Sequence, residues 1–321
     1  MFIGALYLLA ACLCWSVVFV IPEFLTGFSP LEISLGRFFF FGITSVFLIL
    51  AKRIDLFHRS YGAIWKKAFW FGCISTIGCY TFTVLCIQYA NPATAALLFG
   101  TVPIVVVVCG NFRRKEYPFR IFLVPCLIMS LGILISNREA FLWEGGSLTS
   151  YLMGVLSGIA GTGCWVWYVL ACFDYMEKNP KISSMDWVMM LGTSVFFQVL
   201  LVSLGLFWML DDVTKYFSFT TELQYFLLGS FILGVVSSWI ALYCWTQGNL
   251  RLPIALVGQL AIFELVFGLI LIYVVKTRFP SFMEIAGIGL MIAGVFQGFR
   301  ALKKRDNLGG IKKAISETDI A

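Results

Sequence analysis

The chain has 321 residues, of which 60% are hydrophobic and only 12% are charged. Soluble domains carry about 25% charged residues, so the composition excludes a soluble protein and indicates a polytopic membrane protein. Its formal charge is +6, and the single histidine and ten cysteines show no metal-site or disulfide spacing. We therefore expect no metal, no cofactor and no nucleic-acid partner.

Charges and turn residues divide the chain into ten apolar segments, each of about the length that crosses a bilayer. In chain order they are Phe2–Ile21, Leu31–Ala51, Ala68–Ala90, Ala93–Phe112, Phe119–Asn137, Leu148–Phe173, Trp187–Leu210, Gln224–Leu250, Pro253–Val275 and Phe279–Phe299. The sequence therefore predicts an all-α fold with ten transmembrane helices.

The basic residues between these segments predict the topology. If the N-terminus lies in the cytoplasm, 18 of the 23 Lys and Arg residues fall in cytoplasmic segments and 4 in external ones. The remaining one, Arg37, lies inside the second segment. Because cytoplasmic loops of membrane proteins are enriched in Lys and Arg, this split predicts that both termini are cytoplasmic.

The second half of the chain repeats features of the first. Matching positions are Cys14-Trp15 with Cys164-Trp165, Pro92 with Pro253, and Met129–Gly132 with Met291–Gly294. The offset grows from 150 to 162 positions. Because each half has five helices, an odd number, the halves insert with opposite orientation. Inverted repeats of this kind are typical of secondary transporters, whose substrate site lies between the repeats.

These features divide the chain into four parts. They are a first repeat at 1–137, an external linker at 138–147, a second repeat at 148–301 and a basic cytoplasmic tail at 302–321. We expect the tail to contact anionic lipid.

Each half also contains its own set of short motifs. The first half contains Trp15-Ser16, Ser29-Pro30, Arg37-Phe38, Asn91–Ala96, Thr101–Pro103 and Lys115-Glu116, and the second contains Gly154, Cys164-Trp165, Ala241–Trp245, Gly287 and Gly294. Together they resemble the EamA-type branch of the drug/metabolite transporter superfamily. The resemblance implies a ten-helix carrier of small metabolites, often an amino-acid exporter, in a plasma membrane such as the bacterial inner membrane. It also implies a central cavity between helices 1–4 and 6–9.

The two halves differ chemically at two places. The family often has a proline in the fourth helix of both halves; Pro103 fills that place in the first half, but Glu264 stands at the equivalent position of the second. Glu116, at the end of the first half, is replaced by Arg278. Substrate assignments taken from relatives are therefore uncertain for this chain.

Arg37 and Glu264 are the two charges that the sequence places deep in apolar segments. Counted from the outer helix ends at about 1.5 Å per residue, they lie about 10 Å and about 18 Å deep. Charged residues inside a membrane are costly, so they usually mark a substrate or ion pathway. Arg37 would hold a substrate carboxylate, and Glu264 would bind an ammonium group or carry a coupling proton. The alternatives are a structural ion pair, or an Arg37 side chain that extends to the outer surface.

Polar and aromatic side chains inside other helices are further candidates for the pathway. They are Trp15, Ser16, Tyr80, Thr83, Thr101, Pro103, Trp165, Tyr168, Trp239, Tyr243 and Gln259. Each alone is more often a packing residue. Trp15 and Trp165 differ from the rest because the repeat relates them, and the inverted arrangement predicts that they act at opposite sides of the cavity.

The sequence favours a secondary transporter that moves a small polar metabolite by alternating access. No nucleophile–base pair or phosphate loop is visible, so we do not expect an enzyme. The alternatives left open are a membrane enzyme or subunit that binds a lipid or quinone, and a non-transporting scaffold.

Overall fold

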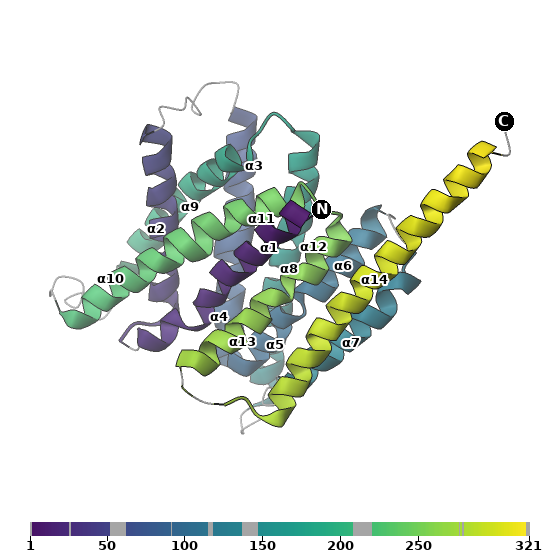
Figure 1. Cartoon of the computed structure of the whole chain (residues 1–321). Helices are drawn as coiled ribbons and strands as arrows, with labels where there is room; N and C mark the ends of the chain where they lie inside the picture. Colours follow the sequence, from purple (N-terminus) through teal and green to yellow (C-terminus); the bar gives the residue numbers. More distant parts are fainter. Residues whose placement is uncertain are drawn as a thin grey trace.

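The computed structural model describes residues 2–25, 27–51, 62–90, 92–114, 118–136, 147–207, 220–275, 277 and 279–318. Throughout these residues every regular element is a helix (Figure 1). The predicted all-α class is therefore confirmed.

The first half of the chain contains the elements up to α7. They are α1 (Phe2–Ser16), η1 (Val17–Phe19), η2 (Ile21–Phe24), α2 (Pro30–Ala51), α3 (Gly62–Gly72), η4 (Cys73–Gly78), α4 (Cys79–Tyr89), α5 (Pro92–Gly100), α6 (Val102–Arg114) and α7 (Arg120–Ser136). The short elements η1 and η2 are 3₁₀ helices, whereas η4 is a π-helical turn that joins α3 to α4.

The second half begins at α8. Its elements are α8 (Leu148–Lys178), α9 (Ser184–Phe207), α10 (Thr221–Gly234), η7 (Val235–Ile240), α11 (Ala241–Asn249), α12 (Ile254–Ala261), α13 (Phe263–Val275) and α14 (Phe282–Thr318). η7 is also a π-helical turn, and it begins 162 positions after η4. π-Helical turns are rare and occur often at functional sites.

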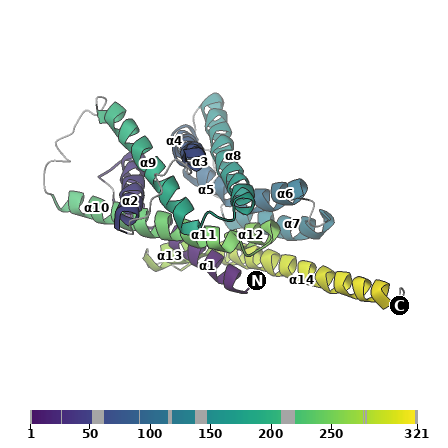
Figure 2. The ribbon, with the colours of Figure 1, turned by 90° about the horizontal axis from the view of Figure 1, so that it is seen from above.

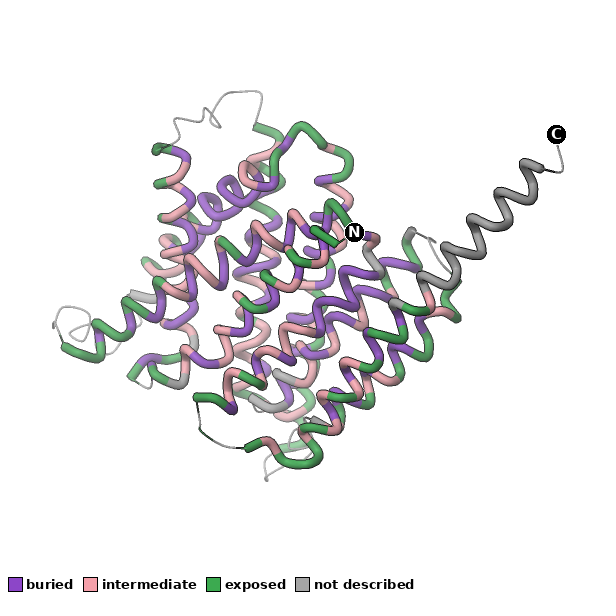
Figure 3. Tube along the Cα trace, in the orientation of Figure 1, coloured by how far each residue is buried: buried purple, intermediate pink, exposed green. Residues whose placement is uncertain are grey.

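Seven helical stretches are long and apolar enough to cross a membrane, and three shorter apolar helices accompany them. The shorter ones are Val102–Arg113, Arg120–Ile135 and Phe282–Gly298. Many of the apolar side chains on α7, α10 and α14 are exposed (Figure 3), as is usual for surfaces that face lipid. The arrangement in two inverted repeats and the orientation of the termini stay predictions.

Two segments that the sequence predicts as continuous helices are each interrupted. The fourth predicted segment breaks at Thr101 into α5 and α6, as expected because Pro103 cannot donate a backbone hydrogen bond. The ninth breaks at Ile262 into α12 and α13, although no proline stands there. Both breaks are tightened by a bond of the 3₁₀ type, from Ile104 N to Thr101 O and from Leu265 N to Ile262 O.

Helices of the two halves pack against each other rather than apart. α1 packs on α11 and α13, α2 packs on α9 and α10, and α8 packs on α4 and α5. α14 lies along α7 for much of its length (Figures 1 and 2). The first helix of each half is therefore embedded among helices of the other half.

The contact between α7 and α14 is reciprocal. A side chain at Gly132 would meet Gly287 O at 2.7 Å and the Met291 side chain at 2.9 Å. In the same way, a side chain at Gly294 would meet the Met129 side chain at 2.6 Å. Gly132 and Gly294, like Met129 and Met291, are 162 positions apart, so equivalent residues of the two halves make equivalent contacts.

The packing of the broken helices is not reciprocal. α6 and α12 pack closely, and a side chain at Gly258 would meet Pro103 O at 2.9 Å. The equivalent half-helices are α13 and α5, and in the described residues they do not pack together to a comparable extent. Gly268 of α13 instead packs against the Phe19 ring of η1. The structure therefore packs one pair of half-helices together more extensively than the equivalent pair.

Candidate functional site

Arg37 reaches from α2 across to the π-helical turn η7. Its Nε donates a hydrogen bond to Ser238 Oγ at 2.8 Å, and its Nη2 donates to the carbonyl oxygen of Ser237 at 3.0 Å. The side chain is half-buried. These contacts direct the guanidinium across the helix bundle, which differs from the alternative that Arg37 extends to the outer surface.

Glu264 is the second residue of α13, directly after the break at Ile262. A carboxylate in the first turn of a helix is stabilised by the partial positive charge of the helix N-terminus. The side chain is half-buried, and it makes no hydrogen bond or ion pair with another described residue. Its carboxyl group therefore has no charged partner in direct contact among the described residues.

Arg37 and Glu264 form no direct ion pair with each other. Helix α1 contacts residues next to both of them. The Cys12 thiol lies 3.6 Å from Leu260 O, just before the break that precedes Glu264. Two residues further along α1, Cys14 O accepts a hydrogen bond from Ser237 Oγ at 2.7 Å. α1 thus contacts the surroundings of both charges.

Tyr80, on α4, belongs to the same group of residues. Its ring meets Phe38 edge-on at 6.4 Å, and its hydroxyl group is hydrogen-bonded to Ser34. It also interacts electrostatically with Arg37. Among the predicted residues, Arg37, Tyr80 and Glu264 are the ionisable ones that form this candidate site.

Trp15 and Trp165 contact each other, with ring centroids 5.8 Å apart. Trp15 also packs on Trp245 at 5.0 Å, and Trp165 packs on Tyr168 at 5.4 Å. The prediction that the two tryptophans act at opposite sides of the cavity stays a prediction, and the structure adds that their rings touch. Each half provides its tryptophan at the equivalent point of its first helix, so the two rings meet where the halves meet.

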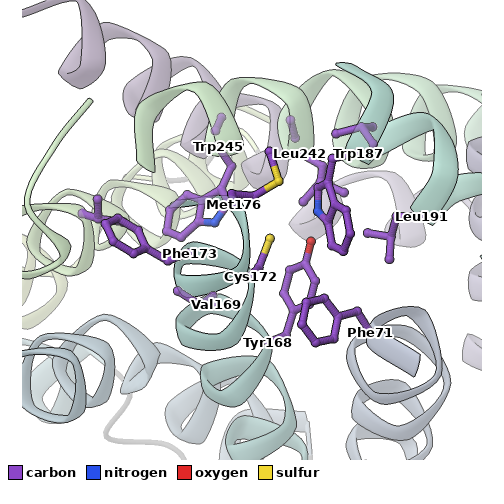
Figure 4. Close-up of a cluster of buried hydrophobic side chains, with 14 of the residues drawn as sticks. Phe71, Tyr168, Val169, Cys172, Phe173, Met176, Trp187, Leu191, Leu242 and Trp245 are labelled. Atoms are coloured by element: carbon purple, nitrogen blue, oxygen red, sulfur yellow. The ribbon is translucent and has the colours of Figure 1, made fainter. Parts of the chain in front are cut away.

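Tyr168 lies in a buried cluster with Phe71 and Trp187 (Figure 4). Its hydroxyl group points toward the Trp187 ring, and its side chain is only 1% exposed. This placement is that of a packing residue between α3, α8 and α9.

Trp239 and Tyr243 stack on each other, with centroids 6.0 Å apart and planes 12° apart. Both are half-buried, and Tyr7 of α1 meets Tyr243 edge-on at 6.5 Å. Trp239 belongs to η7, the turn that holds Arg37. Trp239 directly follows Ser238, so this second aromatic pair lies next to the residues that bind Arg37.

Three predicted hydroxyl residues donate to their own stretch of helix. Ser16 bonds Leu13 O at 2.6 Å. Thr83 and Thr101 do the same with the carbonyl oxygens three or four residues earlier, at 2.8 and 2.6 Å. Because a hydroxyl group has one hydrogen to donate, these residues offer a ligand only their lone pairs.

Gln259 and Pro103 lie at helix contacts. Gln259 is fully buried on α12 beside Gly298 of α14, and its amide atoms find no hydrogen-bond partner in the described residues. Pro103 is buried in the first turn of α6, beside Gly258. The structure does not place Gln259 with the Arg37 contacts.

The sequence reasoning missed Ser237 and Ser238. A signal for them exists, because Ser75 and Thr76 stand 162 positions earlier in the other π-helical turn. In the described part of the chain, no three His, Cys, Asp or Glu side chains come close enough to hold a metal ion.

Comparisons with known proteins agree with this picture. The sequence model of the EamA-like transporter family matches residues 2–138. The chain is similar to the inner membrane protein YtfF of Escherichia coli (strain K12), with 25% identity over 316 residues, 93% of this chain and 95% of that protein. Its fold is similar to that of a protein of known crystal structure, with a TM-score of 0.73 and 20% identity, over 92% of this chain and 95% of that one.

Proposed function

We propose that the chain is a secondary transporter which exports a small polar metabolite, such as an amino acid, because its residues 2–138 match the sequence model of the EamA-like transporter family. We place it in the bacterial inner membrane, because its relative YtfF is an inner membrane protein and seven of its helices are long and apolar enough to span a membrane.

The proposed architecture is ten transmembrane helices in two inverted repeats, with both termini in the cytoplasm. Three observations support it: the π-helical turns, the helix breaks and the α7–α14 glycine contacts each recur at a nearly constant offset of 161 or 162 positions. The excess of Lys and Arg in the segments assigned to the cytoplasm supports the orientation.

The observation that carries the proposal is the placement of Arg37 and Glu264. Both lie inside apolar helices, both are half-buried, and they form no ion pair with each other. A charge inside a membrane costs about 2.5–3.5 kcal/mol on insertion scales, so two charges that do not neutralise each other by direct contact suit a ligand pathway better than a structural pair.

In this mechanism the two charges bind complementary parts of the substrate. Arg37 holds an oxyanion such as a carboxylate, since its fork suits planar groups with two oxygens. Glu264 binds an ammonium group or carries the coupling proton. The remaining predicted aromatic residues provide the apolar walls that small-molecule sites have.

The non-reciprocal packing of the broken helices supports alternating access. With the proposed orientation, α6 and α12 are the cytoplasmic halves of helices 4 and 9, and they are packed together. α5 and α13 are the external halves, and they pack together less extensively. This conformation is then closed to the cytoplasm, and exchange of the two arrangements between the repeats would close the external side.

The partners of this transporter are a small-molecule substrate and the lipid bilayer, with the basic tail at 302–321 on anionic lipid. A membrane enzyme or subunit that binds a lipid or quinone is the competing function, and the family match favours the transporter.

The test is a flux assay. The purified chain is reconstituted into proteoliposomes, and the uptake and efflux of a panel of radiolabelled metabolites are measured against empty liposomes. We expect saturable transport of at least one zwitterionic or anionic metabolite. Lack of transport of every compound, with protein that is folded and inserted, would contradict the proposal and favour the enzyme or scaffold.

A further inference from the structure

The π-helical turn η7 presents two oxygens to one edge of the Arg37 guanidinium. Ser238 Oγ accepts from Nε and the carbonyl of Ser237 accepts from Nη2, so the two bonds leave the guanidinium side by side. Both serines are buried, with exposed fractions of 0% for Ser237 and 6% for Ser238. This edge of Arg37 is therefore held away from the solvent by protein oxygens.

The hydroxyl hydrogens of both serines are committed elsewhere. Ser238 Oγ donates to Leu233 O at 3.0 Å, and Ser237 Oγ donates to Cys14 O at 2.7 Å. A hydroxyl group has one hydrogen, so Ser238 Oγ offers Arg37 only a lone pair, the form that a cationic donor requires. The pair of serines thus joins α1, α2 and the α10–α11 helix at one point.

The opposite edge of the guanidinium stays available. Arg has five N–H hydrogens, and two of them are used on η7. Nη1 makes no hydrogen bond to the described residues, and with the second Nη2 hydrogen it forms a fork. Such a fork binds a carboxylate or another planar oxyanion through two parallel hydrogen bonds.

We propose that Ser237 and Ser238 are positioning residues, which fix Arg37 so that this free fork receives the oxyanion of the transported substrate. The inference rests on the proposed function, and it adds the device that determines how the anionic end of the substrate is oriented. We call the two acceptor oxygens, Ser238 Oγ and Ser237 O, the seat of Arg37. Because the seat fixes the plane of the fork, it favours carboxylates over spherical anions of the same charge.

The seat exists in one half only, and this provides a matched control. The turn η4 carries Ser75 and Thr76 at the positions equivalent to Ser237 and Ser238, and both are buried. However, the residue equivalent to Arg37 is Leu191, because α2 begins at Pro30 and the equivalent helix α9 begins 154 positions later at Ser184. Ser75→Ala therefore removes a buried serine hydroxyl group from the same kind of turn without touching an arginine seat.

The first arm of the test needs no substrate. The rate at which phenylglyoxal modifies Arg37 is measured by peptide mass spectrometry in the purified full chain, for wild type, Ser238→Ala, Ser238→Thr and Ser75→Ala. Loss of a hydrogen bond to a charged group corresponds to about a tenfold change in an equilibrium constant. We therefore expect Arg37 to react about tenfold faster in Ser238→Ala. Ser238→Thr keeps the hydroxyl group and should react at the wild-type rate, as should Ser75→Ala.

The second arm uses the carboxylate-bearing metabolite that the flux panel identifies. Ser238→Ala should raise its KM about tenfold and change the maximal rate little, because the fork is misaligned but still charged. Ser238→Thr should restore the KM, and Ser75→Ala should not change it.

The outcomes separate the two proposals. Wild-type reactivity of Arg37 in Ser238→Ala overturns the seat, whatever the transport result. Faster reactivity with an unchanged KM shows that the seat does not orient the substrate, and also overturns the inference. If the wild-type chain moves no metabolite, the proposed function fails, while the first arm still decides whether the seat exists.

Discussion

Glu264 occupies in α13 the position that Pro103 occupies in α6. Each is the second residue of a half-helix that begins after a break, and the two are 161 positions apart. The first turn of a helix accepts proline because its N–H groups have no partner within the helix, and it favours glutamate because of the helix dipole. The same backbone position thus tolerates an inert residue in one half and an ionisable one in the other.

This equivalence predicts that proline is tolerated at position 264. We expect Glu264→Pro to be produced and inserted like wild type, because the change falls in the first turn of α13. The control is Leu269→Pro, in the middle of α13, where proline costs about 3 kcal/mol. Size-exclusion chromatography and thermal unfolding in detergent compare the variants. Equal damage by both prolines would contradict the placement of Glu264.

The contact between Trp15 and Trp165 predicts a non-additive effect on stability. Each alanine variant should lose the same ring contact, worth about 0.5–1.5 kcal/mol beyond the buried area. The double variant should then be less destabilised than the sum of the single ones. Trp70→Ala is the control, because that side chain is 62% exposed. Strict additivity in thermal unfolding would mean that the rings do not interact.

The close contact at Gly258 predicts that a larger side chain there opens the cytoplasmic side of the protein. A Cβ there would lie 2.6 Å from the Val107 side chain and 2.9 Å from Pro103 O, so Gly258→Ala should weaken the α6–α12 contact by about 1–3 kcal/mol. We expect a larger fraction of molecules to be open to the cytoplasm. A cysteine is substituted for Thr101, and its rate of labelling by an impermeant thiol reagent in inside-out vesicles measures the fraction of molecules open to the cytoplasm.

Gly289→Ala is the control for Gly258→Ala, because a side chain at Gly289 meets nothing within 4 Å. It should leave the labelling of position 101 at the wild-type level. If the two alanine variants label alike, the α6–α12 contact does not close the cytoplasmic side.

The topology is tested at two loops that lie outside the described residues. A cysteine at Ser60 should be protected from an impermeant maleimide applied to intact cells, whereas one at Leu142 should react. The reverse pattern would invert the orientation, and with it the assignment of α6 and α12 to the cytoplasmic side.

The sequence was sufficient for the helical class. The break at Thr101 has a local signal, because Pro103 removes a donor, but the break at Ile262 has none. The seat of Arg37 was not predictable, since it depends on a π-helical turn 200 positions away. Periodicity places a residue on a helix face, but it does not reveal which carbonyl another helix will meet.

The candidate site shows the same limit. Depth along the helices put Arg37 and Glu264 about 8 Å apart in level, a gap that two long side chains or one substrate can bridge. Depth did not show that Trp15 and Trp165 touch, or that Gln259 lies beside Gly298, because both depend on how helices from the two halves cross.

The most direct test of the central claim, that Glu264 lies on the transport pathway, is a flux measurement on Glu264→Gln. Proteoliposomes with wild type, Glu264→Gln or the exposed-site control Glu222→Gln are loaded with the metabolite that the panel identifies, and initial rates are recorded with and without an imposed pH difference. We predict that wild type and Glu222→Gln transport alike and respond alike to the pH difference. Glu264→Gln, although folded and inserted, should lose net transport or its response to the pH difference. Wild-type rates for Glu264→Gln at every pH would contradict the account and make Glu264 a packing carboxyl.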